Sequence, residues 1–187
     1  MGSTFGWGLA AGAIAIALMS AANASAQETW TDPLGRFTLL YDQAEWRPST
    51  TLNSLEGDAL TIESTRRGGD DLLLVCKVNE RPSAARGAQQ DLANAHVRSL
   101  SEADVEGIVN GDVTGLEHRD VNGMAVVAYS QTLAGFNTEW RVFFLVTAEA
   151  VYSVTLMCGA QPPVADGDLA ATRAVLDSLA FPQGVNQ

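Results

Sequence analysis

The sequence is poor in positive charge. Lys77 is the only lysine among 11 cationic residues, and 22 acidic residues bring the formal net charge to −11 at pH 7. Binding to nucleic acids and to anionic lipid headgroups depends on clustered Lys and Arg that release counterions. A chain of this charge is therefore not expected to bind nucleic acid. Net negative charge otherwise favours solubility and names no partner.

Histidine is equally scarce, and the common catalytic motifs are missing. His96 and His118 are the only two, which limits both metal binding and histidine-based acid–base catalysis. The chain has no G-x-S-x-G, S-x-x-K or H-E-x-x-H motif and no glycine-rich phosphate loop. Asp166-Gly167-Asp168 has the acid spacing of a calcium loop but lacks the further ligands and the distant glutamate, so we interpret it as a helix cap. We predict no catalytic residue, no cofactor and no metal site.

Charge is also absent from the first 27 residues. Leu9 to Met19 is apolar, too short to cross a membrane, and Ala24-Ser25-Ala26 supplies the small residues that signal peptidase accepts. We predict a signal peptide over residues 1–26 and a single domain over 27–187, which is periplasmic or secreted and has no stable membrane anchor after cleavage. An uncleaved anchor formed by Phe5 to Ala26 is the alternative. A native protein that retains Met1, or that is recovered from the cytosol with both thiols free, would contradict the prediction of an exported, cleaved domain.

Two cysteines remain, Cys76 and Cys158. Both fall in strand-like runs, and each shares a strand face with apolar residues, so they meet in the core if the two strands are neighbours. Oxidising compartments preserve disulfides, and we predict one here. Two inert buried thiols are the alternative. Without C-x-x-C spacing, a thiol oxidoreductase is disfavoured.

The first half of the chain alternates strand patterns with turns. Arg36 to Tyr41 is predicted to be a half-buried strand, and Asp42 to Pro48, with Trp46, leaves the sheet. Ala59 to Thr65 and Asp71 to Val78 form a predicted β-hairpin whose tip carries Arg66, Arg67 and two glycines.

A helix is predicted to follow that hairpin. Pro82 and Ser83 end the strand and open a helix that reaches about Leu100, with an apolar stripe at helical spacing. The stripe consists of Ala85, Ala88, Leu92, Ala95 and Leu100. The acidic segment from Ser101 to Glu106 is a loop or a short helical turn.

The second half predicts an antiparallel meander and a final helix. Asn122-Gly123 is a type I′ hairpin signal, and the last helix starts near Asp166 or Asp168 and ends at Phe181-Pro182. The four strand candidates are Val113 to His118, Met124 to Leu133, Glu139 to Thr147 and Val151 to Gly159, with tight turns at Gly135 to Asn137 and Ala148 to Ala150. Strands that are apolar on both faces need cover on both faces. The predicted fold class is α+β: an antiparallel sheet of about six to seven strands with helices on both faces, an α/β/α sandwich.

The order of these elements resembles a known group of folds. A Gly-aromatic strand, Gly35-Arg36-Phe37-Thr38-Leu39-Leu40-Tyr41, is followed by Trp46, and a meander and a helix ending in Leu-Asp-Ser-Leu-Ala-Phe close the chain. This pattern resembles the sandwich of PsbP-like photosynthetic extrinsic proteins, Mog-type Ran-binding factors and periplasmic DcrB-like proteins. The resemblance covers most of Gly35 to Phe181 and implies a binding or assembly role without carrying over any functional residue.

Three functional hypotheses follow. The first is an exported, non-enzymatic binding or assembly domain whose partner is another periplasmic or envelope protein, with Arg66 and Arg67 at the hairpin tip as a docking site for an acidic or phosphorylated group. Trp46 is either an interaction anchor or a lid on the core. Trp140 lies on a strand candidate and is assigned to the core, and His96, beside the apolar stripe of the predicted helix, is interpreted as a partly buried structural residue. The second is a carrier of a small apolar ligand in a pocket between sheet and helix. The third is a hydrolase with an unrecognised site. The oligomeric state is not predicted.

Overall fold

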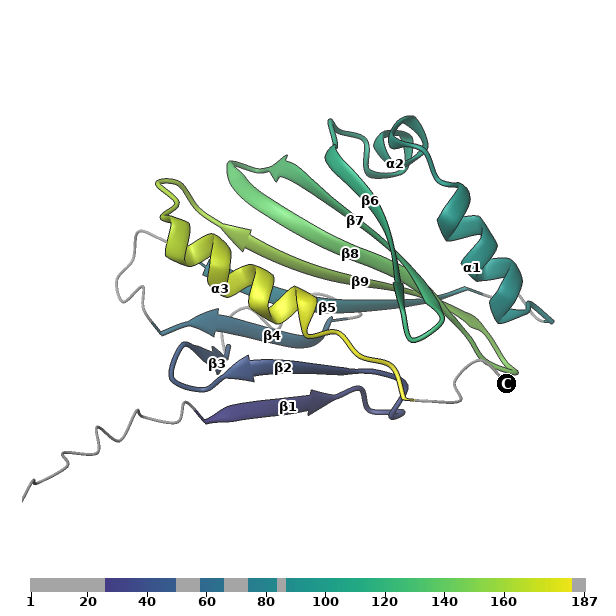
Figure 1. Ribbon diagram of the computed structural model, residues 1–187, viewed down its shortest axis with the longest axis horizontal. Coiled ribbons are helices and arrows are strands. Elements are labelled where there is room, and N and C mark those ends of the chain that lie inside the picture. The colour runs from purple at the N-terminus through teal and green to yellow at the C-terminus, as the bar shows by residue number, and fades with distance from the viewer. Residues whose placement is uncertain (1–25, 50–57, 66–73, 84–86, 183–187) are drawn as a thin grey trace, which may run out of the picture.

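A computed structural model describes residues 26–49, 58–65, 74–83 and 87–182 of the chain. Two sheets and three helices make up this part (Figure 1). The strands are β1 (Gln27–Thr31), β2 (Thr38–Asp42), β3 (Trp46–Pro48), β4 (Asp58–Ser64), β5 (Leu74–Ser83), β6 (Thr114–Val121), β7 (Met124–Leu133), β8 (Phe136–Val146) and β9 (Val151–Ala160). The helices are α1 (Gln90–Ser99), α2 (Glu102–Val109) and α3 (Asp166–Asp177). Residues 1–25 of the predicted signal peptide and the Arg66-Arg67 tip lie outside the described residues.

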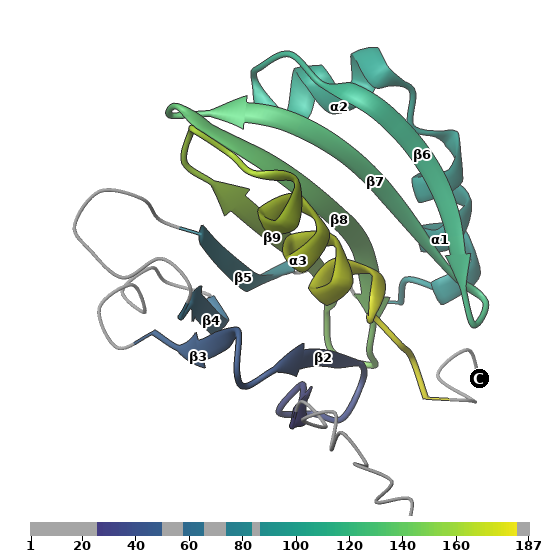
Figure 2. The same cartoon turned by 60° about the vertical axis from the view of Figure 1, so that its left-hand side comes forward.

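The main sheet is an antiparallel layer between helices. Its seven strands run in the order β3-β4-β5-β9-β8-β7-β6, and β1 and β2 form a separate two-stranded ribbon. Helix α3 and that ribbon lie on one face, while α1 and α2 lie on the other face (Figure 2). The α+β prediction of a six- to seven-stranded antiparallel sheet with helices on both faces is confirmed. Among the described residues no helix is long and apolar enough to cross a membrane.

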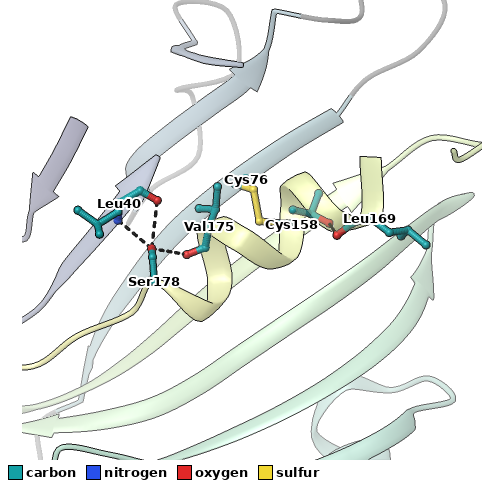
Figure 3. Close-up of a disulfide and its surroundings, with 7 residues drawn as sticks. Leu40, Cys76, Cys158, Leu169, Val175 and Ser178 are labelled. Atoms are coloured by element: carbon teal, nitrogen blue, oxygen red, sulfur yellow. Dashed lines mark hydrogen bonds between the residues drawn. A yellow bond between two sulfur atoms is a disulfide. The ribbon is translucent and has the colours of Figure 1, made fainter. Parts of the chain in front are cut away.

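The larger core lies beneath α3. Phe37, Phe143 and Phe181 meet there edge-on or tilted, with ring centroids 5.0 to 6.4 Å apart. Such offset aromatic geometry adds to the energy gained by burial. Ser178, just after α3, links that end of the helix to β2. Its hydroxyl accepts a 2.8 Å hydrogen bond from Leu40 N–H on β2 (Figure 3).

The same core contains the disulfide. Cys76 on β5 and Cys158 on β9 are directly opposite each other in the antiparallel register, and a disulfide joins them under α3 (Figure 3). Both cysteines are almost fully buried. The placement of each cysteine on an apolar strand face is the reason they meet, because the two faces pack against the same helix.

Tight turns set the register of the meander. Asn122 and Gly123 both have positive φ, 52° and 85°, as a type I′ turn requires, so the predicted hairpin is confirmed. The next turn comes one residue earlier than predicted. Ala134 and Gly135 occupy it with φ of 49° and 84°, and strand β8 already begins at Phe136.

Several boundary predictions are wrong. The segment after Asp42 leaves the β1–β2 ribbon, but it does not stay outside a sheet: Trp46–Pro48 forms β3, the strand beside β4 in the main sheet. Strand β5 does not end before Pro82: it continues to Ser83. Among the described residues, β4 pairs with β5 only as far as Asn79. Beyond Asn79 no described strand pairs with the β4 side of β5, and proline is tolerated at such an edge. Strand β1 was not predicted, and the acidic segment after Ser101 proves to be helix α2.

Helix α1 also differs from the prediction. It begins at Gln90, after Gly87 with φ of 74°, a left-handed conformation that ends any helix before it. The predicted apolar stripe is only partly right: Leu100, just after the helix, is buried, but Leu92 is 67% exposed and Ala95 is exposed, and Ala85 lies outside the described residues. The buried residues within α1 are Asn94 and Val97, so an amide and an apolar residue together attach this helix.

Candidate functional site: an apolar groove between the helices and the sheet

Small-molecule sites are clefts of about 300 to 1,000 Å³. The described part of the chain has a groove of about 530 Å³ between α1, α2 and the sheet. Its floor consists of alternate residues of adjacent strands. The antiparallel registers align Lys77, Met157, Trp140 and Tyr129 in one row across β5, β9, β8 and β7. A period of two along each strand then places the neighbouring rows on the same face. These rows are Asn79, Thr155, Val142 and Val127, and Arg81, Ser153 and Phe144.

The two helices form the other wall. Val97 and Leu100 from the α1 end, and Val105, Ile108 and Val109 from α2, line the groove opposite the strands. Ile108 is 70% exposed, and Trp140, Val142 and Phe144 on the floor are only partly buried. The helices therefore cover the β7–β8 part of this face incompletely and leave apolar surface accessible.

The floor is rigid at its aromatic end. The rings of Tyr129 and Trp140 stack with centroids 5.8 Å apart and planes 8° from parallel. Trp140 Nε1 donates a 2.8 Å hydrogen bond to Thr138 Oγ1, which fixes the indole in that position. Burial raises the pKa of Tyr129 to about 12, so its phenol is neutral over the physiological range. This end of the groove offers uncharged, apolar surface.

The opposite rim, on β4 and β5, is polar. Asp58 accepts hydrogen bonds from Lys77 Nζ at 3.1 Å and from Asn79 Nδ2 at 3.0 Å. Arg81 Nε donates to Asn79 Oδ1 at 3.2 Å, and its side chain is exposed. The groove is therefore polarised, with aromatic and aliphatic walls beneath the helices and a charged rim on β5.

Local capping holds α2 in place over the groove. Ser101 Oγ accepts a 3.2 Å hydrogen bond from Asp104 N–H, and Asp104 Oδ2 accepts one of 2.9 Å from Ser101 N–H. These reciprocal bonds satisfy two helix-terminal donors. The pKa of Asp104 is lowered mainly by the hydrogen bond that Ser101 Oγ donates to its carboxyl group, and next by the one from Ser101 N–H. Asn110 ends the helix in a left-handed conformation, φ 54°.

The residues predicted as sites do not gather here. Cys76 and Cys158 are bonded to each other in the opposite core, and Arg66 and Arg67 lie outside the described residues. Trp46 is 2% exposed and belongs to the core beneath α3. In this structure its indole therefore offers no surface to a partner. This agrees with the alternative that Trp46 is a lid on the core.

Two groove residues were misjudged from the sequence. Trp140 was assigned to the core, but it is half-buried on the groove floor. His96 was expected to be a partly buried structural residue, but it is exposed on α1 and lines the groove, with its ring 5.9 Å from that of Phe144. The alternation of apolar residues along β8 was visible in the sequence. How far the helices extend over that strand was not.

A second hollow, of about 440 Å³, lies at the other end of the sheet. It is lined mostly by polar side chains of β6, β7 and β8, including Thr114, Gln131 and Glu139. Arg173 Nε already donates to Glu139 Oε1 at 2.7 Å. Leu169 is the one apolar side chain among the residues that line it, so this hollow is a weaker candidate for an apolar ligand than the groove.

Comparisons with known proteins identify the class of fold. No protein-family model and no curated protein sequence matches the chain. The solution structure of cyanobacterial PsbP, CyanoP, from Synechocystis sp. PCC 6803 is similar over 87% of this chain and 96% of that one, with 13% identity and a TM-score of 0.50. LpqN of Mycobacterium tuberculosis, a protein involved in cell envelope biogenesis, is similar over 84% and 91%, with 12% identity and a TM-score of 0.47.

The likeness to CyanoP shows that the chain has a PsbP-like fold. This confirms the PsbP part of the predicted resemblance. The DcrB-like and Mog-type parts stay predictions. At 13% identity the likeness concerns the fold alone, so function has to be argued from the groove.

Proposed function

We propose that this protein is an exported, non-enzymatic binding domain that carries a small apolar molecule in the groove between α1, α2 and the sheet. The observation that supports the proposal is the half-buried apolar floor formed by Trp140, Val142 and Phe144 under incomplete helical cover. The hypothesis of a carrier with a sheet-helix pocket is thereby favoured over the other two.

Energetics support a ligand at this place. Apolar surface contributes about 25 cal/mol for each Å² removed from water, so exposed aromatic and aliphatic side chains gathered in one concave groove are a source of binding free energy. The groove volume of about 530 Å³ falls in the range of small-molecule sites. Protein partners more often bind flat surfaces with a polar rim.

The polar groups of the groove support a non-enzymatic role. Asp58, His96 and Ser153 all line it, but among the described residues no hydrogen bond joins any two of them. Asp58 is instead bonded to Lys77 and Asn79. Nucleophilic catalysis needs a nucleophile within hydrogen-bond reach of an oriented base.

Export is part of the proposal and is supported by the predicted signal peptide and by the Cys76–Cys158 disulfide, since such bonds persist in oxidising compartments. We further propose that the carrier meets another periplasmic or envelope protein through Arg66 and Arg67. Pull-down from an envelope extract tests this: changing Arg66 and Arg67 to Glu is expected to lose the partner, and an unchanged set of bound proteins contradicts the contact.

Binding of a neutral fluorescent probe tests the central proposal. N-phenyl-1-naphthylamine, which brightens in apolar surroundings, is expected to bind the wild-type protein. Thr155 faces the middle of the groove between Asn79 and Val142, so Thr155→Phe fills it and is expected to weaken probe binding about tenfold. Thr132→Phe, at an exposed position of β7 that does not line the groove, is the matched control. Equal binding by all three proteins contradicts the proposal.

A further inference from the structure

We infer that the ligand is a single-chain amphipathic anion: an alkyl chain that carries one carboxylate or phosphate headgroup. The chain lies against α2 and β8, and the headgroup lies beside Arg81. This inference rests on the proposed carrier function and names its class of ligand.

The composition of the groove changes steadily across the sheet. Each row of groove-facing residues begins with a charged or amide side chain on β5 and ends with an aromatic or aliphatic one on β8. The rows pass from Lys77 to Trp140, from Asn79 to Val142 and from Arg81 to Phe144, through Met157, Thr155 and Ser153 on β9. A ligand that lies across these strands therefore needs one polar end and one apolar end.

The polar end is suited to an anion. The rim carries Lys77, Arg81 and Asp58, a sum of two positive charges and one negative, in a chain whose net charge is −11. Asp58 is 4% exposed and bonded to Lys77, which neutralises that pair. Arg81 makes no ion pair with any described residue, and its one hydrogen bond there, through Nε, leaves the terminal nitrogens available. A guanidinium binds carboxylate or phosphate with two parallel hydrogen bonds.

Charge also argues against two other occupants of the groove, an anionic membrane and a second copy of the chain. An anionic bilayer is repelled by the acidic surface, so a single lipid-like molecule fits better than a membrane. A second copy of the chain brings the same net charge of −11 against the first. One alkyl chain with a compact headgroup matches a groove of about 530 Å³.

Calorimetric titration of the purified protein with three ligands of equal chain length tests the inference. Dodecanoate and dodecyl phosphate are used below their micelle concentrations, and dodecanol below its solubility limit. The two anions are expected to bind about tenfold more tightly than the alcohol, as a charge-assisted hydrogen bond implies. Arg81→Ala is expected to remove that difference and to leave dodecanol binding unchanged. Arg47→Ala is the matched control, because Arg47 is exposed on β3, away from the groove, and its loss changes the net charge equally.

The outcomes separate the two claims. Equal affinity for the alcohol and the anions overturns the headgroup inference and leaves the carrier proposal standing. Preference for the anions that survives in Arg81→Ala also overturns it. Binding of none of the three ligands, together with no binding of the neutral naphthylamine probe, contradicts both claims. A preference for only one anion supports the inference and identifies carboxylate or phosphate as the headgroup.

Discussion

Gln90 and Asn94, one turn apart on α1, are bonded to each other and to the two strands that separate beneath the helix. Gln90 Nε2 donates to Asn94 Oδ1 at 3.2 Å and to Phe144 O at 2.8 Å, and Gln90 Oε1 accepts from Val146 N–H at 2.9 Å. Strands β7 and β8 pair only up to Val127 and Val142. The side chain of Gln90 therefore supplies β8 with partners that β7 does not.

Asn94 does the same for β7, which makes it a sensitive position. Its Oδ1 accepts from Ala125 N–H at 3.2 Å, and its Nδ2 donates to Gly123 O at 3.1 Å. Asn94→Ala leaves these backbone groups without their side-chain partner. We expect the free energy of unfolding to fall by about 2 kcal/mol.

Asn94→Ala is also expected to weaken binding of the naphthylamine probe to the protein, because α1 forms one wall of the groove. Urea unfolding and probe titration measure the two effects. Gln89→Ala, an exposed residue before α1 that makes no side-chain cap, is the control. A variant with unchanged stability contradicts the role given to the amide.

The disulfide is expected to be a major source of stability. Cys76 and Cys158 are 82 residues apart in sequence, and on the chain-entropy model closing such a loop contributes about 4 to 5 kcal/mol. Reduction of the wild-type protein is therefore expected to lower the urea midpoint sharply. In the double variant Cys76→Ala, Cys158→Ala the reductant is expected to change nothing, which makes it the control. A wild-type midpoint that is insensitive to reductant contradicts the prediction.

The meander, the hairpins and α3 could be predicted because their signals are local. Alternation along β7, β8 and β9 gives the strand faces, and Asn122-Gly123 gives the turn. The attachment of α1 could not be predicted, because its buried side holds amides and hydrophobic periodicity selects the exposed Leu92 instead. The short polar strand β1 carries no such pattern at all.

The groove escaped prediction for a tertiary reason. Apolar residues on both faces of β8 show that both faces need cover, and Trp140 was placed in the core on that ground. The extent of the cover depends on the positions of the helices. Helix α1 contacts β7 and β8, and Val105 of α2 lies in the same apolar cluster as Val127 and Tyr129 of β7, while the groove residues of β8 stay half-buried. Alternation along one strand contains no information on how far the helices extend over the sheet.

A buried charge cluster joins the β1–β2 turn to β5. Arg36 Nε donates to Asp32 Oδ2 at 2.7 Å, its Nη2 is bonded to Glu80, and its guanidinium lies 4.6 Å from the ring centre of Tyr152. Burial raises the pKa of Asp32 by itself, but hydrogen bonds from Arg36 bring it below its ordinary value. Burial, followed by the hydrogen bond with Asp32, raises the pKa of Glu80.

Arg36→Met is expected to destabilise the protein strongly, because it leaves two buried carboxyl groups without a cation. The expected loss at pH 7 is about 3 to 5 kcal/mol. The loss is expected to shrink as the pH falls toward 4, since protonation of Glu80 and then Asp32 removes the repulsion. Unfolding at both pH values measures it. Arg47→Met, in an exposed pair with Glu63, is expected to cost less than about 1 kcal/mol. Equal effects of the two changes contradict the prediction.

Asp177, the last residue of α3, is the counter-ion of Arg141 on β8. Asp177 Oδ1 accepts from Arg141 Nη2 at 2.8 Å and from Arg119 Nη1 at 2.6 Å, and the Arg141 side chain is only 6% exposed. Burial by itself raises the pKa of Asp177, but the hydrogen bonds and charges of both arginines bring it below 3.8. A depressed folded-state pKa contributes stability that is present above the unfolded-state value and is lost as the pH falls through the folded-state value.

Asp177→Asn is therefore expected to cost about 1 to 2 kcal/mol at pH 7, an amount kept small because the Asp177 side chain is 48% exposed to screening solvent. As the pH falls through the lowered pKa of Asp177, where the wild-type carboxyl group takes up its proton, the two proteins are expected to converge in stability. Urea unfolding from pH 7 to pH 2.5 follows the difference. Glu149→Gln, in an exposed turn, removes the same charge without an arginine partner and is expected to show no such convergence. A stability difference for Asp177→Asn that stays constant down to pH 2.5 means that the contact acts by packing and not by charge.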